Sequence, residues 1–166
     1  MWNALPINRT FIMLKLGSLA PDISIQTDCC WFALTEQIGK KVVVFFFPRA
    51  DTSGCTKEAI QFFALHDAFT EEKTVVIGIS KDKPAKLARF RLKHNLTCLL
   101  GTDHETDLCE QFGVWVKKSM YGKNFMGVQR SSFIIDIDRK IIKIWPKVKV
   151  EGHAQDVLTS VKALSA

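Results

Sequence analysis

Long hydrophobic runs are missing from this sequence of 166 residues. No apolar segment approaches the ~20 residues that a membrane-spanning helix needs. The N-terminal stretch MWNALPINRTFIMLKLG has neither a basic start nor a sustained apolar centre, so it is not typical of a secretory signal peptide. We therefore expect a cytoplasmic protein with no membrane partner. Residues 1–12 are interpreted as an N-terminal extension that can be disordered, ahead of one domain over residues 13–166.

The cysteines and histidines lack a recognised metal-binding pattern. The five cysteines contain no Cys-x-x-Cys pair, and no Cys/His cluster has the spacing of zinc ligands. Without a secretion signal, a disulfide scaffold is not expected in a chain of this size. We predict neither a metal nor another cofactor, and we interpret the histidines as structural or surface residues. The residues concerned are Cys29, Cys30, Cys55, Cys98 and Cys109, and His66, His94, His104 and His153.

A concentrated charge of one sign is also missing. The chain has 23 Lys and Arg against 17 Asp and Glu, and its net charge of +6 is scattered along the sequence. Nucleic-acid binding usually needs a denser basic stripe with stacking aromatic residues, so no nucleic-acid partner is expected. The 47% of hydrophobic and 24% of charged residues are typical of a globular protein with a full core.

Hydrophobic periodicity indicates alternating strands and helices in the first two thirds of the chain. Residues 41–48, KVVVFFFP, predict a buried strand of a mostly parallel sheet that ends at Pro48. From Thr56 to Phe69 apolar residues recur every three or four positions, which predicts one amphipathic helix. Residues 74–80 predict a second buried strand, and residues 84–95 a helix with a proline in its first turn.

The remaining segments add an antiparallel part to this pattern. After a short strand, residues 103–113 predict a helix with Asp103 as its N-cap. Residues 131–145 predict a β-hairpin and residues 153–164 a last helix. Two short alternating runs around Asp28 predict an N-terminal hairpin at the surface. This order predicts an α/β protein in which helices sandwich a mixed central sheet.

Cys55 has an unusual position in the stretch FFFPRADTSGCTKEA, residues 45–59. It lies between a buried strand and the first turn of a helix, at the sheet edge where open α/β proteins bind ligands. A helix N-terminus stabilises anions, and a thiolate is an anion. Gly54 leaves the sulfur unshielded, and Glu58 is placed as the acidic partner of a capping box. These residues alone leave open a reactive thiol or a small packing residue.

The residues around Cys55 form a more specific motif. Pro48, Thr52 and Cys55 form the pattern P-x-x-x-T-x-x-C, which resembles the active-site signature of the peroxiredoxins, thiol-dependent peroxidases with a thioredoxin-like fold. The segments LGSLAPD, FGVW, MYGKNFMGVQRSSFIID and KIWPKVKVEGHAQDVL are similar to the bacterioferritin comigratory protein, or peroxiredoxin Q, subfamily. The resemblance covers residues 13–164 and implies an antioxidant enzyme that reduces hydrogen peroxide and organic hydroperoxides.

The resemblance implies roles for individual residues. Cys55 would be the peroxidatic nucleophile, whose thiolate attacks the O–O bond and becomes a sulfenic acid. Thr52 would hydrogen-bond the thiolate and the peroxide, and Arg130 would stabilise the thiolate and the charge on the leaving oxygen. The backbone N–H groups of Gly54 and Cys55 would complete this cradle. Pro48 would shield it from water.

Further residues around the site follow from the same resemblance. Glu58 would orient the arginine. Ser53 replaces a proline that is usual in the motif, so a slightly looser loop is expected. Trp115, Tyr121 and Phe125 are predicted to line the rim that admits the tail of a hydroperoxide.

The sequence departs from the family in its resolving cysteine. Ile60 occupies the usual position, and residues 84–94, the other usual location, contain no cysteine. Cys98 and Cys109 are candidates, although packing explains both better. The adjacent Cys29 and Cys30 are placed in a surface turn, where intermolecular disulfides remain an alternative.

We therefore predict a one-cysteine mechanism in which an external thiol, such as thioredoxin, glutaredoxin or glutathione, reduces the sulfenic acid. The sulfenic acid is then more exposed to overoxidation. Nothing in the sequence argues for an assembly, so a monomer is expected.

Two alternatives remain from the sequence. A thiol–disulfide oxidoreductase would carry a cysteine in place of Thr52. A peroxide-sensing or chaperone-like interaction protein would use Cys55 only as a redox switch, whereas the combination with Thr52 and Arg130 favours turnover.

Overall fold

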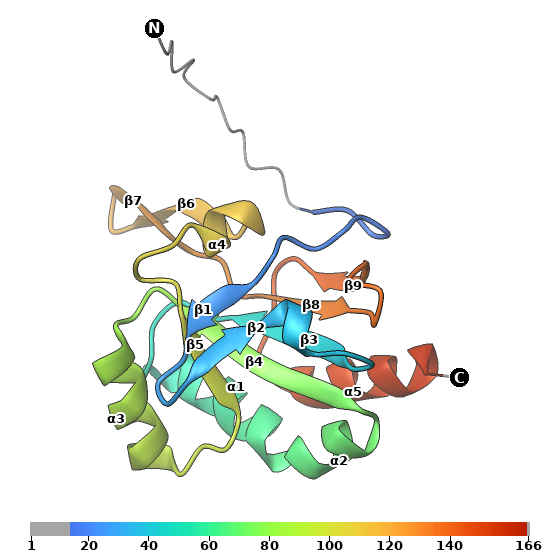
Figure 1. Ribbon diagram of the computed structural model, residues 1–166. Helices are drawn as coiled ribbons and strands as arrows, with labels where there is room; N and C mark the ends of the chain where they lie inside the picture. Colours follow the sequence, from blue (N-terminus) through green and yellow to red (C-terminus); the bar gives the residue numbers. More distant parts are fainter. Residues whose placement is uncertain (1–13, 166) are drawn as a thin grey trace, which may run out of the picture.

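A five-stranded mixed sheet forms the centre of the protein (Figure 1). The computed structural model describes residues 14–165, so the extension predicted for residues 1–12 lies outside the described residues. The strand order is β5-β4-β3-β8-β9, in which β3, β4 and β5 are parallel and β8 and β9 run antiparallel to their neighbours. These strands are β3 (Lys41–Phe46), β4 (Thr74–Ser80), β5 (Leu99–Thr102), β8 (Ser131–Ile135) and β9 (Ile141–Trp145). The predicted mixed sheet is confirmed.

Helices cover one face of the sheet. They are α1 (Ser53–Ala64), α2 (His66–Glu71), α3 (Pro84–His94) and α5 (His153–Leu164). Their buried side chains join one core cluster with Val43 and Phe45 of β3. Phe45 stacks on Phe62 of α1 with ring centroids 4.5 Å apart, and it passes directly over Gly78 of β4. A Cβ atom at Gly78 would collide with that ring. The absence of a side chain at Gly78 therefore allows Phe45 to pack against Phe62 of α1.

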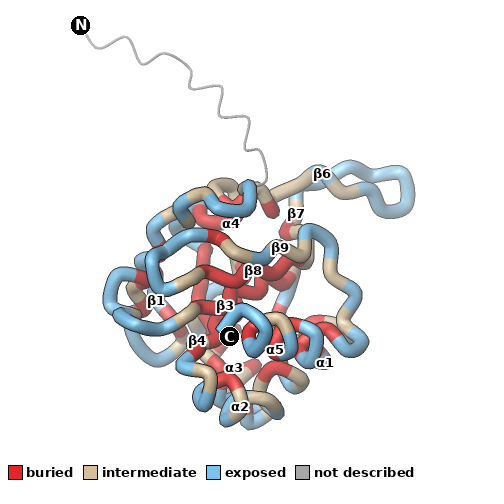
Figure 2. Tube along the Cα trace, turned by 90° about the vertical axis from the view of Figure 1, so that its right-hand side faces the viewer, coloured by how far each residue is buried: buried red, intermediate tan, exposed pale blue. Residues whose placement is uncertain are grey.

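The opposite face carries shorter elements. The hairpin of β1 (Ser24–Gln26) and β2 (Trp31–Ala33), the 3-10 helix η1 (Leu34–Glu36) and the short helix α4 (Leu108–Gln111) pack there. The second core cluster contains Val42, Val44 and Phe46, the alternate residues of β3. Because successive side chains of a strand point to opposite faces, the hydrophobic run of β3 serves both cores. Figure 2 shows β3 and β8 as continuously buried strands at the centre.

Two predicted helices differ from the structure. The helix expected from Thr56 to Phe69 is two helices, because the chain turns at Leu65 between α1 and α2. The helix expected over residues 103–113 contains only Leu108–Gln111. Asp103 nevertheless caps it from a distance, since its carboxylate accepts the N–H groups of Leu108 and Cys109 at 2.9 and 2.8 Å.

A second hairpin was not predicted. Strands β6 (Trp115–Met120) and β7 (Lys123–Val128) form a separate two-stranded sheet and extend away from the body of the protein (Figure 2). Tyr121 and Gly122 form its tip, both with positive φ. This is the geometry of a type I′ turn, whose twist matches that of a hairpin.

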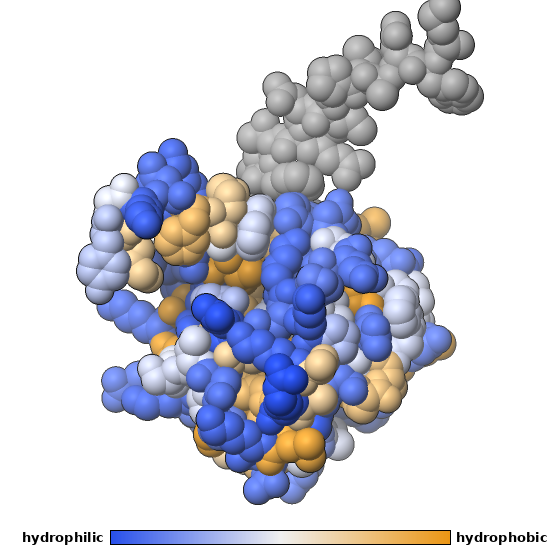
Figure 3. All heavy atoms as spheres, turned by 90° about the vertical axis from the view of Figure 1, so that its left-hand side faces the viewer, coloured by the Kyte–Doolittle hydropathy of each residue, from blue (hydrophilic) through white to orange (hydrophobic). Residues whose placement is uncertain are grey.

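Among residues 14–165, no helix is long and apolar enough to cross a membrane. The face that carries α3 is mainly hydrophilic, with hydrophobic residues between the hydrophilic ones (Figure 3).

Candidate active site

The loop that follows β3 delivers Cys55 to the third position of α1. The first N–H groups of an α-helix have no partner within the helix, and they point toward this end. The side chain of Cys55 turns inward and is only 1% exposed. The sulfur therefore lies at the positive end of the helix, sheltered from bulk water.

Arg130 reaches the same point from a distant part of the chain. It lies between the end of β7 and the start of β8, and its Nη2 donates a hydrogen bond to the Sγ of Cys55 at 3.2 Å. Its backbone carbonyl is fixed by the N–H of Val148, 2.9 Å away. The guanidinium therefore brings a positive charge and a hydrogen-bond donor directly to the sulfur. The two residues that the sequence singled out, 75 positions apart, are thus in direct contact.

Gly54 makes this approach of the arginine feasible. A Cβ atom at Gly54 would lie 3.2 Å from the Nη2 of Arg130, tighter than an ordinary van der Waals contact. The glycine before the cysteine therefore leaves room for the guanidinium at the start of the helix.

Glu58 holds the other side of the guanidinium. Its Oε1 accepts a hydrogen bond from Nη1 of Arg130 at 2.9 Å, and the carboxylate is 1% exposed. Its second oxygen has no hydrogen-bond partner among the described residues. Burial raises the pKa of Glu58 to about 7, although the charge of Arg130 acts in the opposite direction. The pKa of Arg130 is raised: burial opposes this, but the charges of Glu58 and Cys55 outweigh it.

The structure corrects two expectations for this loop. Glu58 is not part of a capping box, because it faces Arg130 and the N-cap residue Thr52 makes no side-chain capping bond. The hydroxyl of Thr52, expected to donate to the thiolate, instead donates to the carbonyl of Arg49 at 2.8 Å. Pro48 is half-buried and lies two residues beyond the end of β3, which the sequence placed at Pro48 itself.

Two aspartates that the sequence analysis missed hold the loop before Cys55. Asp82 accepts the N–H of Ala50 at 2.7 Å. Asp51 has a positive φ of 64° and pairs with Lys93 and His94 at the end of α3. These bonds lower the pKa of Asp51, chiefly through Lys93 and then His94. No local sequence pattern predicts such contacts, because they join segments more than 30 residues apart.

A lysine of the β6–β7 hairpin also belongs to the surroundings of the site. The side chain of Lys118 lies across Gly127, where a Cβ atom would be 3.2 Å from its Cδ. Burial lowers the pKa of Lys118, and the charge of Arg130 lowers it further, while Cys55 acts against both. The ammonium group is thus within electrostatic range of the sulfur.

The three aromatic residues expected to line the rim of the site lie in the β6–β7 hairpin. Trp115 lies at the base of the hairpin, with Lys81 over its ring at 5.0 Å. Tyr121 is 98% exposed at the tip of the hairpin, and Phe125 is 44% exposed along β7. The structure places all three in this hairpin and gives no contact between them and Cys55.

His153 is a structural residue, as expected, but it lies close to the site. Its Nε2 and the Oγ of Ser132 are 2.8 Å apart, and the ring packs edge-on against Phe62 and Trp145. Burial, and to a smaller extent Arg130, lowers its pKa to about 4. The imidazole is therefore neutral near pH 7.

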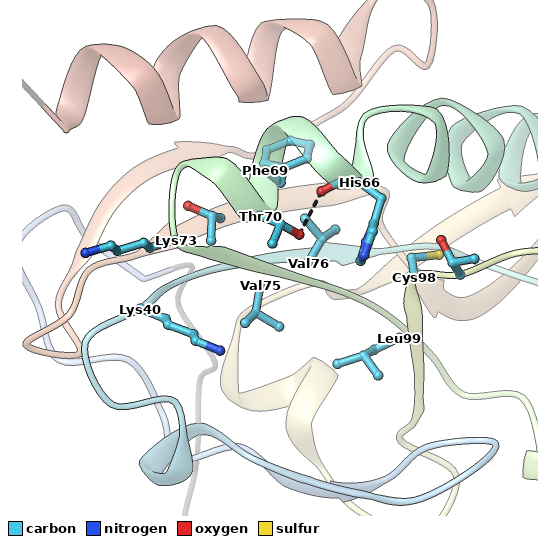
Figure 4. A pocket seen from close by; sticks show the side chains of 11 residues that line it. Lys40, His66, Phe69, Thr70, Lys73, Val75, Val76, Cys98 and Leu99 are labelled. Carbon is cyan, nitrogen blue, oxygen red and sulfur yellow. Dashed lines mark hydrogen bonds between the residues drawn. The ribbon is translucent and has the colours of Figure 1, made fainter.

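Two further cysteines are buried away from Cys55. Cys98 lines a surface cavity of about 290 Å³ beside His66, Phe69 and Leu99 (Figure 4), a cavity that neither Cys55 nor Arg130 lines. Burial raises its pKa to about 11. Burial also raises the pKa of Cys109, helped by the charge of Asp103. Both thiols are therefore poor nucleophiles near pH 7.

The arrangement is suited to nucleophilic chemistry at sulfur. The sulfur of Cys55 lies at a helix N-terminus, and the half-buried guanidinium of Arg130 contacts it and can stabilise charge on a neighbouring oxygen. Within residues 14–165, no three His, Cys, Asp or Glu side chains gather as metal ligands would.

Comparisons with known proteins agree with this geometry. The family model described as AhpC/TSA family matches residues 16–144. Peroxiredoxin Bcp of Bacillus subtilis is 40% identical over 153 residues, which are 92% of this chain and 98% of the relative. Peroxiredoxin Bcp of Escherichia coli K12 is 41% identical over 150 residues, 90% of this chain and 96% of the relative.

Solved structures extend the likeness to the fold. A serine-substituted peroxiredoxin Q of Xylella fastidiosa superposes with a TM-score of 0.88 at 28% identity, covering 93% of this chain and 99% of the other. The bacterioferritin comigratory protein of Xanthomonas campestris gives a TM-score of 0.82 at 31% identity, covering 87% and 92%. The predicted thioredoxin-like architecture is thereby confirmed.

Proposed function

The chain belongs to the AhpC/TSA family, and from this premise we propose that Cys55 is the peroxidatic cysteine of its active site. Its relatives are peroxiredoxins, and the chain is a thiol-dependent peroxidase. The observation that carries the assignment to Cys55 is its contact with Arg130 at 3.2 Å. The alternative of a redox switch without turnover is not favoured.

The first half-reaction follows from this contact. The thiolate of Cys55 attacks one peroxide oxygen, an S–O bond forms and the O–O bond breaks. The leaving oxygen takes a proton and departs as water or as an alcohol, and Cys55 becomes a sulfenic acid. Arg130 stabilises the thiolate before the attack and the leaving oxygen during it. Glu58 holds the guanidinium in place by its hydrogen bond at 2.9 Å.

The second half-reaction needs an external thiol. Ile60 stands at one usual resolving position, and α3 contains no cysteine at the other. Cys98 and Cys109 are buried thiols with raised pKa values. A first thiol therefore converts the sulfenic acid to a mixed disulfide and water, and a second releases Cys55 and forms the external disulfide. Because Cys55 is 1% exposed, the first turn of α1 must open for this step.

The substrate and the reductant can be stated by class. The solved structure of the Xanthomonas protein concerns alkyl peroxide reduction, and we extend alkyl hydroperoxides, with hydrogen peroxide, to this chain. The reductant is thioredoxin, glutaredoxin or a low-molecular-weight thiol. A cytoplasmic monomer, built from one domain over residues 13–166, completes the proposal.

The test combines turnover with mapping of the oxidised sulfur. The fully reduced protein receives one equivalent of hydrogen peroxide, and each cysteine is then mapped by intact and peptide mass spectrometry without reductant. We expect a sulfenic acid on Cys55, no new disulfide, and catalytic loss of peroxide once a thiol is added. Cys55→Ser abolishes this loss, whereas Cys109→Ser, a matched control on a buried cysteine, retains it.

Two results would contradict parts of this proposal separately. A disulfide from Cys55 to another cysteine of the chain would refute the one-cysteine mechanism and leave the peroxidase intact. Oxidation of a different cysteine, with Cys55 still reduced, would refute the assignment of the nucleophile.

A further inference from the structure

The turn between β1 and β2 presents two thiols side by side. Cys29 and Cys30 are both exposed, and their Sγ atoms are 3.6 Å apart. The proposed peroxidase chemistry uses neither of them. At this separation, a single atom of a ligand can contact both sulfurs at the same time.

The turn holds both residues in a fixed conformation. Thr27 is 1% exposed, and its Oγ1 accepts the N–H groups of Cys29 and Cys30 at 3.3 and 2.9 Å. The N–H of Thr27 donates in turn to the carbonyl of Cys30 at 2.7 Å. The same hydroxyl lies 3.3 Å from the sulfur of Cys30. These bonds fix the backbone of the turn, and the Oγ1 of Thr27 also lies within 3.7 Å of the sulfur of Cys29.

Neighbouring elements anchor the turn to the body of the protein. The N–H of Asp28 donates to the carbonyl of Leu100 in β5 at 3.1 Å, and its carboxylate forms a two-pronged ion pair with Arg91 of α3. The pKa of Arg91 is raised mainly by this bond to Asp28, with a smaller contribution from Cys29. A guanidinium is thus near the thiols, while Asp28 compensates its charge. Figure 1 shows the turn beside β5 and α3.

A disulfide within the pair is disfavoured by geometry. Neighbouring Cα atoms across a trans peptide are about 3.8 Å apart, whereas disulfides usually join Cα atoms about 4.4–6.8 Å apart. No cis peptide bond occurs in the described residues. Both cysteines are free in this structure, and both are exposed to an external partner.

The separation of the sulfurs instead matches chelation of a single thiophilic atom. Two sulfurs bonded at about 2.3 Å to one pyramidal centre, with an angle of about 100° between the bonds, lie about 3.5 Å apart, close to the observed 3.6 Å. A structural zinc ion usually needs four protein ligands. No third His, Cys, Asp or Glu joins the pair within residues 14–165. The chelated atom must therefore be satisfied by two sulfurs.

We propose that Cys29 and Cys30 form a dithiol site for trivalent organoarsenicals, whose arsenic carries one organic group and takes two thiolates. The reaction with an arsenoxide, R–As=O, forms two As–S bonds. The two thiol protons leave with the oxygen as one water molecule, and no atom changes its oxidation state. This site is independent of the chemistry at Cys55.

The experiment uses phenylarsine oxide and the full reduced chain. One equivalent is added, excess glutathione is then supplied as a competing monothiol, and bound arsenical is counted by intact mass. We expect one adduct that resists glutathione and is removed by dithiothreitol, because two-point attachment is exchanged only by another dithiol. Cys29→Ser and Cys30→Ser should each lower the glutathione concentration needed for release at least tenfold.

Cys55→Ser serves as the matched control and should retain the resistant adduct. Both substitutions in the turn change exposed side chains, so far-ultraviolet circular dichroism should match that of the unsubstituted protein. A resistant adduct that persists in Cys29→Ser and Cys30→Ser would overturn the proposal, as would an adduct lost only from Cys55→Ser.

Discussion

The carboxylate of Asp82 accepts the backbone N–H of Ala50 at 2.7 Å, which joins the end of β4 to the loop that carries Cys55. The same oxygen accepts the hydroxyl of Ser80 at 2.8 Å, and the second oxygen pairs with Lys86. The position of the nucleophile therefore depends on a side chain in the neighbouring segment of the sheet as well as on its own helix.

Replacement of this carboxylate should weaken both the fold and the reaction. In Asp82→Ala the N–H of Ala50, a residue 2% exposed, loses its partner. An unsatisfied buried donor costs about 1–3 kcal/mol, so urea unfolding should shift by that amount and the rate of Cys55 oxidation should fall. Glu151→Ala, at an exposed carboxylate before α5, is the control and should change neither. Unchanged unfolding in Asp82→Ala would show that the bond does not hold the loop.

Arg130 should be needed as a forked donor and not only as a positive charge. Its two terminal nitrogens serve Cys55 and Glu58 separately, which a lysine cannot reproduce. Removal of one such donor typically costs about 10²–10³ in rate, so Arg130→Gln should lose about this factor in peroxide reduction and Arg130→Lys should recover only part of it.

A control for Arg130→Gln must separate the loss of activity from the effect of leaving the buried carboxylate of Glu58 unpaired. Arg130→Gln leaves Glu58 without its cation, which can destabilise the protein. The double variant Glu58→Gln/Arg130→Gln removes that charge and should regain stability without regaining activity. Arg89→Gln changes an exposed arginine of α3 and should behave as the unsubstituted protein. Full activity in the double variant would contradict the role of Arg130.

Lys118 should increase the reactivity of Cys55 through its charge. The ammonium is half-buried and within electrostatic range of the sulfur. Lys118→Met should slow alkylation of Cys55 by iodoacetamide at pH 7 by about fivefold, which corresponds to about 1 kcal/mol. The exposed neighbour Lys117 offers the matched variant Lys117→Met, which should show no change. Equal effects of the two substitutions would indicate a general influence of net charge.

Two buried groups should give opposite pH dependences of stability. The folded pKa of Glu58, about 7, is above its ordinary value of 4.5, so the stability it contributes is present at low pH and is lost as the pH rises toward 7. The folded pKa of His153, about 4, is below 6.5, so its contribution is present above pH 6.5 and is lost as the pH falls toward 4. The two effects largely compensate between pH 4.5 and 6.5.

Single substitutions should separate these contributions. Glu58→Gln should lose stability on acidification from pH 7 to 4.5, and His153→Gln should gain stability over the same range, each by on the order of 2 kcal/mol. Urea unfolding at several pH values measures both. The double variant Glu58→Gln/His153→Gln is the control, and its free energy of unfolding should vary little with pH. If the free energies of the two single variants changed in parallel with pH, the assignment would be contradicted.

The sequence was sufficient where local pattern and burial agree. The runs at β3 and β4 are hydrophobic on both faces, and this identified central strands with nearly correct ends. Of the residues that the family resemblance singled out, Cys55 and Arg130 are in direct contact.

Sequence patterns did not predict the features that depend on contacts between distant segments of the chain. The β6–β7 hairpin is mostly exposed, so it has no alternation of buried and exposed residues that would reveal a strand. The hydroxyl of Thr52 donates to the carbonyl of Arg49, an acceptor that the motif does not indicate. The roles of Asp51, Asp82 and Lys118 depend on contacts across the fold, which spacing along the chain does not encode.

The separate β6–β7 hairpin has a practical consequence for engineering. Its tip at Tyr121 and Gly122 is exposed and free of the central sheet, yet its second strand leads within two residues to Arg130. Exposed loop tips tolerate inserted sequence well. A circularly permuted fluorescent protein grafted at this tip would be mechanically linked to the arginine beside Cys55, which makes the chain a scaffold for a genetically encoded peroxide biosensor.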